Sequence, residues 1–170
     1  DLIATRRQEG RPDHPVRIVV DSGARTPVSA AILNRGPGER IIACSNTADP
    51  SRVAALAPLA TIIQVGESVV DLPQLLRILG DRGIKVLMVE GGGTLLGSLF
   101  AGGLVDEFLT YVGSLIIGGR DAPTPADGTG FRVAGDFPRL SLLHVSQIDD
   151  GVLLHWSVAH PGPGDSSERT

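Results

Sequence analysis

The stretch Val89-Glu90-Gly91-Gly92-Gly93-Thr94-Leu95 places three consecutive glycines between an apolar run and a helical pattern. Residues 84–89 are almost continuously apolar over the length of a strand, and turn residues 81–83 precede them. From 94 to 100 the spacing is helical. Glycines let a backbone approach a ligand closely, and the first N–H groups of a helix attract anions. On geometry alone, the stretch predicts either a phosphate-binding turn or a tight strand-to-helix turn that binds nothing.

The residues before this stretch alternate between strand-like and helical patterns. Asp49 and Asp71 each stand where a helix N-cap is expected, and Pro50 occupies a first helical position. Strands separated by helices are typical of a mostly parallel sheet. The expected strands are 16–20, 41–45, 61–65 and 84–89, and the expected helices are 50–57, 72–79 and 94–100.

The residues after the third helix read differently, because strand-like segments follow one another without helices between them. Asp149-Asp150-Gly151 is a hairpin signal between the last two segments. We therefore predict an α/β fold, with a mostly parallel central sheet, helices on both faces and antiparallel strands at the C-terminal edge. The expected C-terminal strands are 108–113, 115–117, 140–148 and 152–158.

Composition narrows the function classes. A chain of 170 residues is long enough for one domain with its own core, and a net charge of −4 without a Lys/Arg run argues against a nucleic-acid partner. No apolar stretch reaches membrane-spanning length, and the four histidines lack metal-ligand spacing. The single cysteine, Cys44, lies in a strand-like run and is interpreted as a buried apolar residue, which fits a reducing cytoplasm. We expect no metal, membrane or nucleic-acid partner.

Several motifs in one order carry a family resemblance. Val19-Val20-Asp21-Ser22 with Arg25 and Pro27 precedes the glycine stretch, and Gly103-Leu104-Val105-Asp106-Glu107, Tyr111, Ile117-Gly118-Gly119, Ala122-Pro123 and Asp127-Gly128 follow it. Over residues 1–158 the chain resembles the riboflavin-biosynthesis pyrimidine reductase family, which includes the reductase half of the bacterial deaminase–reductase and its stand-alone archaeal and fungal counterparts. The resemblance implies a dihydrofolate-reductase-like three-layer fold.

The resemblance also implies an activity. Family members use NADPH to reduce the ribosylamino group of an aminopyrimidine ribose 5′-phosphate to a ribitylamino group. Arg25 would meet the 2′-phosphate of the cofactor, and Ser22 would hydrogen-bond the cofactor from the end of the first strand. The helix N-terminus would hold the cofactor phosphates through Gly91, Gly92, Gly93, Thr94, Leu95, Leu96, Gly97 and Ser98.

Three residues match the family's substrate positions. Glu90 matches a substrate-contacting glutamate and is the expected catalytic residue, since a carboxylate suits the amino edge of a diaminopyrimidine. Ala4, through its backbone, and Arg7 match the segment that binds the ribose phosphate. A carboxylate at the end of a buried strand is costly unless it has a partner or faces a cleft, which favours a functional Glu90.

Other interpretations stay open for several residues. Ser22 could cap a turn, Arg25 could be a solvated loop charge, and Arg7 could belong to a disordered terminus. Asp106 and Glu107 are expected to orient the following strand, and Gly118-Gly119 to form a bulge or a dimer-facing turn.

The function has two rivals, and the organisation of the chain is part of the prediction. One rival is a related reductase on the same fold with another substrate, and the other is a non-catalytic nucleotide-binding module. We expect one reductase domain over 1–160, lacking the family's N-terminal strand and helix, and a disordered tail over 161–170. Uncovered apolar strands near the C-terminus predict a homodimer. The sequence leaves open whether the pyrimidine is already deaminated and whether a deaminase domain is fused upstream.

Overall fold

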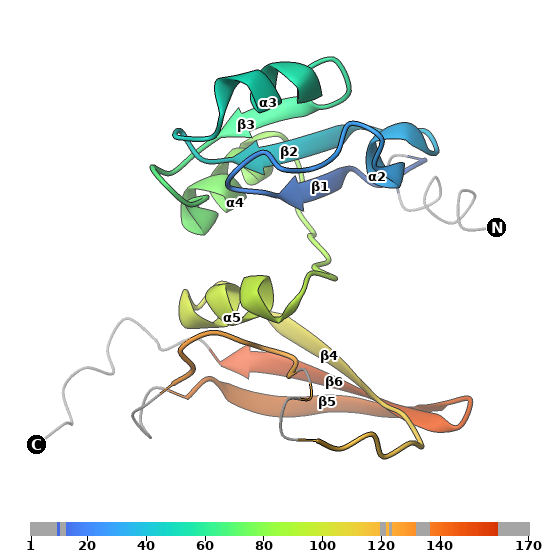
Figure 1. Ribbon diagram of the computed structural model, residues 1–170. Helices are drawn as coiled ribbons and strands as arrows, with labels where there is room; N and C mark the ends of the chain where they lie inside the picture. The colour runs from blue at the N-terminus through green and yellow to red at the C-terminus, as the bar shows by residue number, and fades with distance from the viewer. Residues whose placement is uncertain (1–9, 11–12, 120–121, 123, 132–136, 160–170) are drawn as a thin grey trace, which may run out of the picture. The chain divides into compact units, whose positions relative to one another are not determined.

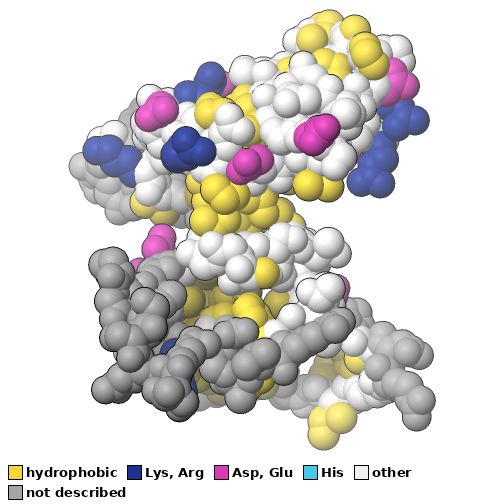
Figure 2. Space-filling view, turned by 90° about the vertical axis from the view of Figure 1, so that its left-hand side faces the viewer, with side chains coloured by type: hydrophobic (Ala, Val, Ile, Leu, Met, Phe, Trp, Pro, Cys, Tyr) yellow, Lys and Arg dark blue, Asp and Glu magenta, His cyan; other side chains and the backbone are white. Residues whose placement is uncertain are grey.

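A computed structural model describes residues 10, 13–119, 122, 124–131 and 137–159 (Figure 1). They belong to two compact units, the first ending at Val86 and the second beginning at Leu87. Each unit has its own sheet, and each is described by itself below. On the face of the first unit that Figure 2 shows, acidic and basic side chains are interspersed.

The first unit is built on a parallel sheet of three strands in the order β1-β2-β3. The strands are β1 (Arg17–Val20), β2 (Arg40–Cys44) and β3 (Thr61–Gln64). The strands expected at 16–20, 41–45 and 61–65 are confirmed, with ends that differ by at most one residue. Parallel neighbours need long crossovers, and here α2 (Ala31–Asn34) and α3 (Pro50–Leu56) lie in them.

Both aspartate caps are confirmed. Asp49 accepts a hydrogen bond from the backbone N–H of Ser51 at the start of α3, at 2.8 Å. Asp71 accepts one from the N–H of Gln74 at the start of α4 (Leu72–Asp81), also at 2.8 Å. Each carboxylate satisfies one of the N–H groups that a helix leaves unpaired in its first turn.

Strand β2 shows why helices cover both faces of this sheet. Its side chains alternate between two cores. Ile41 and Ala43 pack with Leu75 and Leu79 of α4, whereas Ile42 and Cys44 pack with residues that include Leu33 of α2 and Leu56 of α3. A strand that is apolar on both sides needs a cover on both sides, so the first unit is a helix–sheet–helix sandwich.

The second unit holds the antiparallel strands, in the order β4-β6-β5. They are β4 (Glu107–Val112), β5 (Arg139–Ile148) and β6 (Gly151–Ala159), and the expected hairpin joins the last two. Helix α5 (Gly93–Ala101) packs on this sheet through an edge-to-face contact between Phe100 and Phe108, with ring centroids 5.3 Å apart. A register shift between Leu142 and His144 marks a bulge in β5.

Two expected strands are wrong. Residues 84–89 form no strand. The described strands also lie in two sheets, a parallel one and an antiparallel one, where the sequence predicted one sheet with an antiparallel edge. The exposed fractions of Val86 and Met88 are 82% and 71%. An apolar run indicates that a segment favours burial, but a strand also needs a neighbouring strand to pair with. None of the described strands pairs with residues 84–89. Residues 115–117 likewise form no strand, and Ile116 is fully exposed.

In the part of the chain that the structure describes, no helix is long and apolar enough to cross a membrane. The same residues contain no cluster of three or more His, Cys, Asp or Glu side chains that could hold a metal ion. Cys44 is a free thiol that is fully buried, as expected. Burial raises the pKa of this thiol, and the nearby negative charge of Asp21 raises it further by a smaller amount. The predicted tail at 161–170 lies outside the described residues.

Candidate functional site

The glycine stretch forms the N-terminus of α5. Gly92 is the N-cap residue, with φ −67° and ψ 167°, and no side chain caps the helix among the described residues. The N–H groups of Leu95 and Leu96 both donate to the carbonyl of Gly92, at 3.0 and 3.2 Å. The expected helix is confirmed, and its first turn has no side-chain cap to satisfy its N–H groups. Such an end can bind an anion through backbone N–H groups.

The glycines of the stretch differ in what surrounds them. A Cβ on Gly92 would meet nothing within 4 Å. A Cβ on Gly91 would come within 2.8 Å of the Leu95 side chain. A Cβ on Gly93 would overlap the carboxylate of Asp127. Of the three consecutive glycines, Gly92 therefore offers the most open backbone for a ligand.

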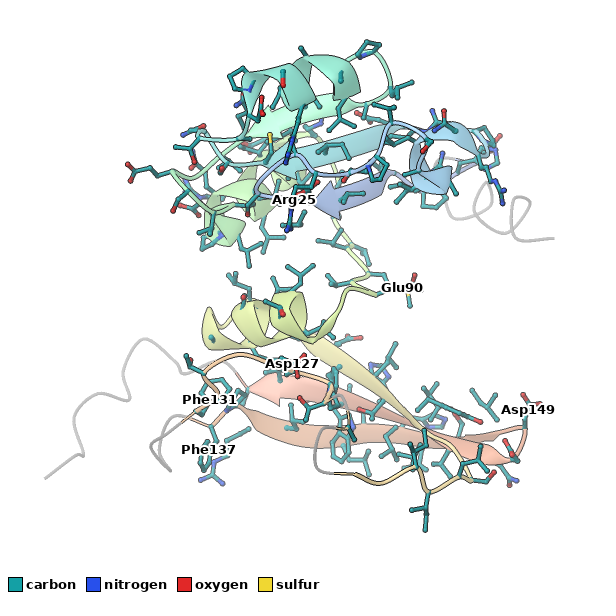
Figure 3. All side chains as sticks on the ribbon, viewed as in Figure 1. Arg25, Glu90, Asp127, Phe131, Phe137 and Asp149 are labelled. Atoms are coloured by element: carbon teal, nitrogen blue, oxygen red, sulfur yellow. The ribbon has the colours of Figure 1, made fainter. Side chains whose placement is uncertain are left out.

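Asp127 lies against α5 and explains two of the glycines (Figure 3). Its N–H donates to the carbonyl of Gly93 at 2.9 Å, and its own carbonyl occupies the place that a Cβ on Gly97 would take. The hydroxyl of Thr124 donates to its carboxylate at 2.6 Å. Gly93 and Gly97 therefore form a flat helix face on which this loop is seated. The sequence pattern carried no signal for this contact, although it singled out Asp127-Gly128 as a motif.

Glu90 immediately precedes the glycines and is exposed (Figure 3). The buried strand end expected before it is wrong, because no strand forms at 84–89, so the cost of burying a carboxylate does not favour a functional Glu90. What remains is its position, two residues before the N-cap of α5. A carboxylate there can accept hydrogen bonds from donor groups of a ligand that also reaches the helix N-terminus.

The other residues expected on α5 lie in its first turns. Thr94 and Ser98 are exposed, and the hydroxyl of Ser98 donates back to the carbonyl of Thr94 at 2.8 Å. Leu95 and Leu96 are half-buried, so only their backbone is suited to contact a phosphate.

Ser22 and Arg25 belong to the first unit. The hydroxyl of Ser22 accepts a hydrogen bond from the N–H of Val70 at 3.1 Å, which ties the end of β1 to a distant loop. It can still donate its own proton to a ligand. Arg25 is 77% exposed in its side chain and lies 3.5 Å from Asp21.

Asp21 holds the turn that carries Arg25. Its carboxylate accepts from the N–H and the hydroxyl of Thr26, each at 2.7 Å. Burial pushes the pKa of Asp21 upward, but the hydrogen bonds from Thr26 and Arg25 outweigh burial and leave the pKa below its usual value. The charged form of Asp21 therefore stabilises this turn at neutral pH.

The remaining expectations fall into two groups. Ala4 and Arg7 lie outside the described residues. Glu107 pairs with His155 across β4 and β6, with 2.8 Å between Oε2 and Nε2, and the carbonyl of Asp106 accepts from the N–H of Val158 at 2.8 Å. The contact of Glu107 agrees with a structural role for its side chain.

Comparison with known proteins identifies the family. The model of the RibD C-terminal domain matches residues 2–154. The chain belongs to this family. It is 42% identical over 131 residues to the 2,5-diamino-6-ribosylamino-4(3H)-pyrimidinone 5′-phosphate reductase of Archaeoglobus fulgidus, covering 77% of the chain and 59% of that protein. It is 40% identical over 157 residues to the protein of the same name from Methanothermobacter thermautotrophicus, covering 92% of the chain and 72% of that protein.

A solved structure supports the fold of this RibD-family chain. A pyrimidine reductase-like protein from Corynebacterium diphtheriae superposes with a TM-score of 0.76 over 93% of the chain and 66% of its own length, at 16% identity. The expected α/β, dihydrofolate-reductase-like fold is confirmed.

Proposed function

We propose that the chain is an NADPH-dependent reductase whose substrate is 2,5-diamino-6-ribosylamino-4(3H)-pyrimidinone 5′-phosphate. The archaeal relatives that are 40–42% identical to it over the aligned residues carry this substrate in their names. The deaminated pyrimidine, 5-amino-6-(5-phosphoribosylamino)uracil, is the alternative substrate. The Escherichia coli RibD protein, a longer chain, is 32% identical.

The observation that carries the proposal is the N-terminus of α5 with Glu90 beside it. Gly92 leaves backbone open at a helix end that lacks a side-chain cap, and an acidic side chain lies two residues earlier. The open end suits the phosphates of NADPH, because N–H groups and the helix dipole both favour negative charge. The carboxylate of Glu90 suits the amino groups of a diaminopyrimidine.

The chemistry asks little covalent help from the protein. NADPH, when bound, supplies a hydride to C1′ of the ribosylamino group. The residues of this chain would hold the phosphates, orient the pyrimidine ring through Glu90 and keep the reacting atoms close together. We assign Ser22 and Arg25 to cofactor binding and Ala4 and Arg7 to the substrate phosphate, as the family resemblance implies.

Glu90→Gln tests the proposal, because it keeps the shape of the side chain and removes its charge. With the diamino substrate and NADPH, we expect kcat/KM to fall roughly tenfold or more, since hydrogen bonds to charged groups are worth about 1.5–3 kcal/mol. The Kd for NADPH should stay unchanged. Glu39→Gln is the matched control, since Glu39 pairs with Arg82 in the first unit. Parent-like kinetics in Glu90→Gln would assign Glu90 to another role, and a parent protein that oxidises NADPH with neither pyrimidine would refute the reductase.

Two further proposals concern the setting. We place the reductase in the cytoplasm, because its single cysteine is a free, buried thiol and the chain therefore needs no oxidising compartment. We also propose a homodimer, for which the second unit offers half-exposed aliphatic side chains on β5.

A further inference from the structure

The first unit contains an open hollow at the carboxyl ends of β1 and β2. It has a volume of about 550 Å³, within the range of small-ligand sites. Its walls come from the loop after β1 and from α3, and they include Arg25, Pro27, Val28, Arg52, Ala55 and Leu56. Ligands of parallel α/β sheets bind outside the carboxyl ends of the strands, which is where these two segments lie.

Two arginines that line this hollow, Arg25 and Arg52, pair with carboxylates only through part of their guanidinium groups. Arg25 meets Asp21 only through Nε, at 3.5 Å, and Arg52 meets Asp49 only through Nε, at 3.9 Å. Both carboxylates make their short hydrogen bonds elsewhere, to Thr26 and to Ser51. Within the described residues, the terminal nitrogens of both guanidinium groups therefore have no ion-pair partner.

Apart from Thr26, the rest of the hollow is apolar. Pro27 and Val28 line it from the loop after β1, and Ala55 and Leu56 line it from α3. An apolar lining with two guanidinium groups suits a ligand that joins a flat ring to a phosphate. Arginine binds phosphate through two parallel hydrogen bonds and also stacks on aromatic rings.

We infer that this hollow binds the adenosine 2′-phosphate end of NADPH, and that Arg52 is a second phosphate-binding residue beside Arg25. The inference rests on the proposed function and extends it, because it makes Arg52 a determinant of the preference for NADPH over NADH. Arg52 lies 27 positions after Arg25 and on a helix, so no local motif joins the two. The fold brings them to one hollow because β1 and β2 are parallel neighbours.

Calorimetric titration of the full-length protein with adenosine 2′,5′-bisphosphate and with 5′-AMP tests the inference. The two ligands differ only in the 2′-phosphate. We expect Arg52→Ala to weaken the bisphosphate roughly tenfold, as loss of a charged hydrogen bond does, and to leave 5′-AMP unchanged. The ratio of kcat/KM for NADPH to that for NADH should fall by about the same factor. Arg77→Ala is the control, because Arg77 is an exposed arginine of α4 in the same unit; it should change neither value.

The outcomes separate the inference from the proposed function. If Arg52→Ala binds the bisphosphate as tightly as the parent and keeps the same NADPH preference, the hollow is not the 2′-phosphate site, while the reductase activity stands. Equal losses for the bisphosphate and for 5′-AMP would also overturn the inference, since they would show a general change in the unit. A parent that binds NADPH but reduces neither pyrimidine would refute the proposed function and leave the hollow assigned.

Discussion

At the scale of single residues, the glycine stretch combines different roles that its sequence does not separate. Gly93 and Gly97 make room for Asp127, Gly91 makes room for Leu95, and Gly92 faces open space. A substitution at Gly93 would displace the Asp127 loop as well as any ligand, so a loss of binding there would have two causes. Gly92 is the position at which ligand binding can be tested without disturbing a contact of the protein.

Gly92→Ala should therefore weaken NADPH binding and leave the protein folded. The φ and ψ of Gly92 suit alanine, and its Cβ would meet nothing within 4 Å in the protein. We expect the free energy of unfolding to fall by no more than about 1 kcal/mol, because alanine is a poorer N-cap residue than glycine. The Kd for NADPH should rise roughly tenfold, which corresponds to about 1.4 kcal/mol. Gly80→Ala, inside α4 and also open, is the control. Unchanged NADPH affinity in Gly92→Ala would remove the glycine turn from the cofactor site.

At the scale of elements, the sequence predicts what depends on local patterns. The two aspartate caps, the strand expected at 41–45 and the Asp149-Asp150-Gly151 hairpin each depend on neighbouring residues, and each is confirmed. The strand predicted at 84–89 is wrong because strand pairing depends on a partner strand that is distant in the sequence. The sequence did not predict the contact of Asp127 with α5, nor that Arg25 and Arg52 line one hollow. The reason is the same, since tertiary structure alone brings those segments together.

The hairpin also predicts a sensitive position at Gly151, the first residue of β6. A Cβ there would overlap the ring and hydroxyl of Tyr111 and come within 2.7 Å of the carbonyl of Val112. We expect Gly151→Ala to lower the free energy of unfolding by about 1–3 kcal/mol, the usual cost of overpacking. Urea unfolding followed by the fluorescence of Trp156, the single tryptophan, measures this loss. Gly113→Ala should cost much less, because its Cβ would make an ordinary 3.7 Å contact. Equal stability of the two variants would show that β4 and the hairpin yield without strain.

At the scale of the whole molecule, the two units divide the proposed work. The first unit supplies the hollow with Arg25 and Arg52, and the second supplies the N-terminus of α5 and Glu90. The chain spans 59% of the length of the Archaeoglobus fulgidus relative. The second unit also has an apolar sheet face that its own helix does not fully cover.

This face is the basis of the predicted homodimer. Leu140, Leu142 and Val145 of β5 remain 41%, 50% and 49% exposed, and their partners on β6 show that they share one face of the sheet. Exposed aliphatic side chains on neighbouring strands favour association, and a twofold pairing covers the same face on both copies. We expect the protein to sediment at about twice its chain mass at micromolar concentration, and Leu142→Lys to shift it toward the monomer by placing a charge in the interface. Val69→Lys introduces the same charge at a valine of the first unit that is 67% exposed, and it should leave the dimer intact. Because the face belongs to the second unit alone, dissociation of the dimer by Val69→Lys and not by Leu142→Lys would place the interface elsewhere, and a parent that stays monomeric would refute the dimer.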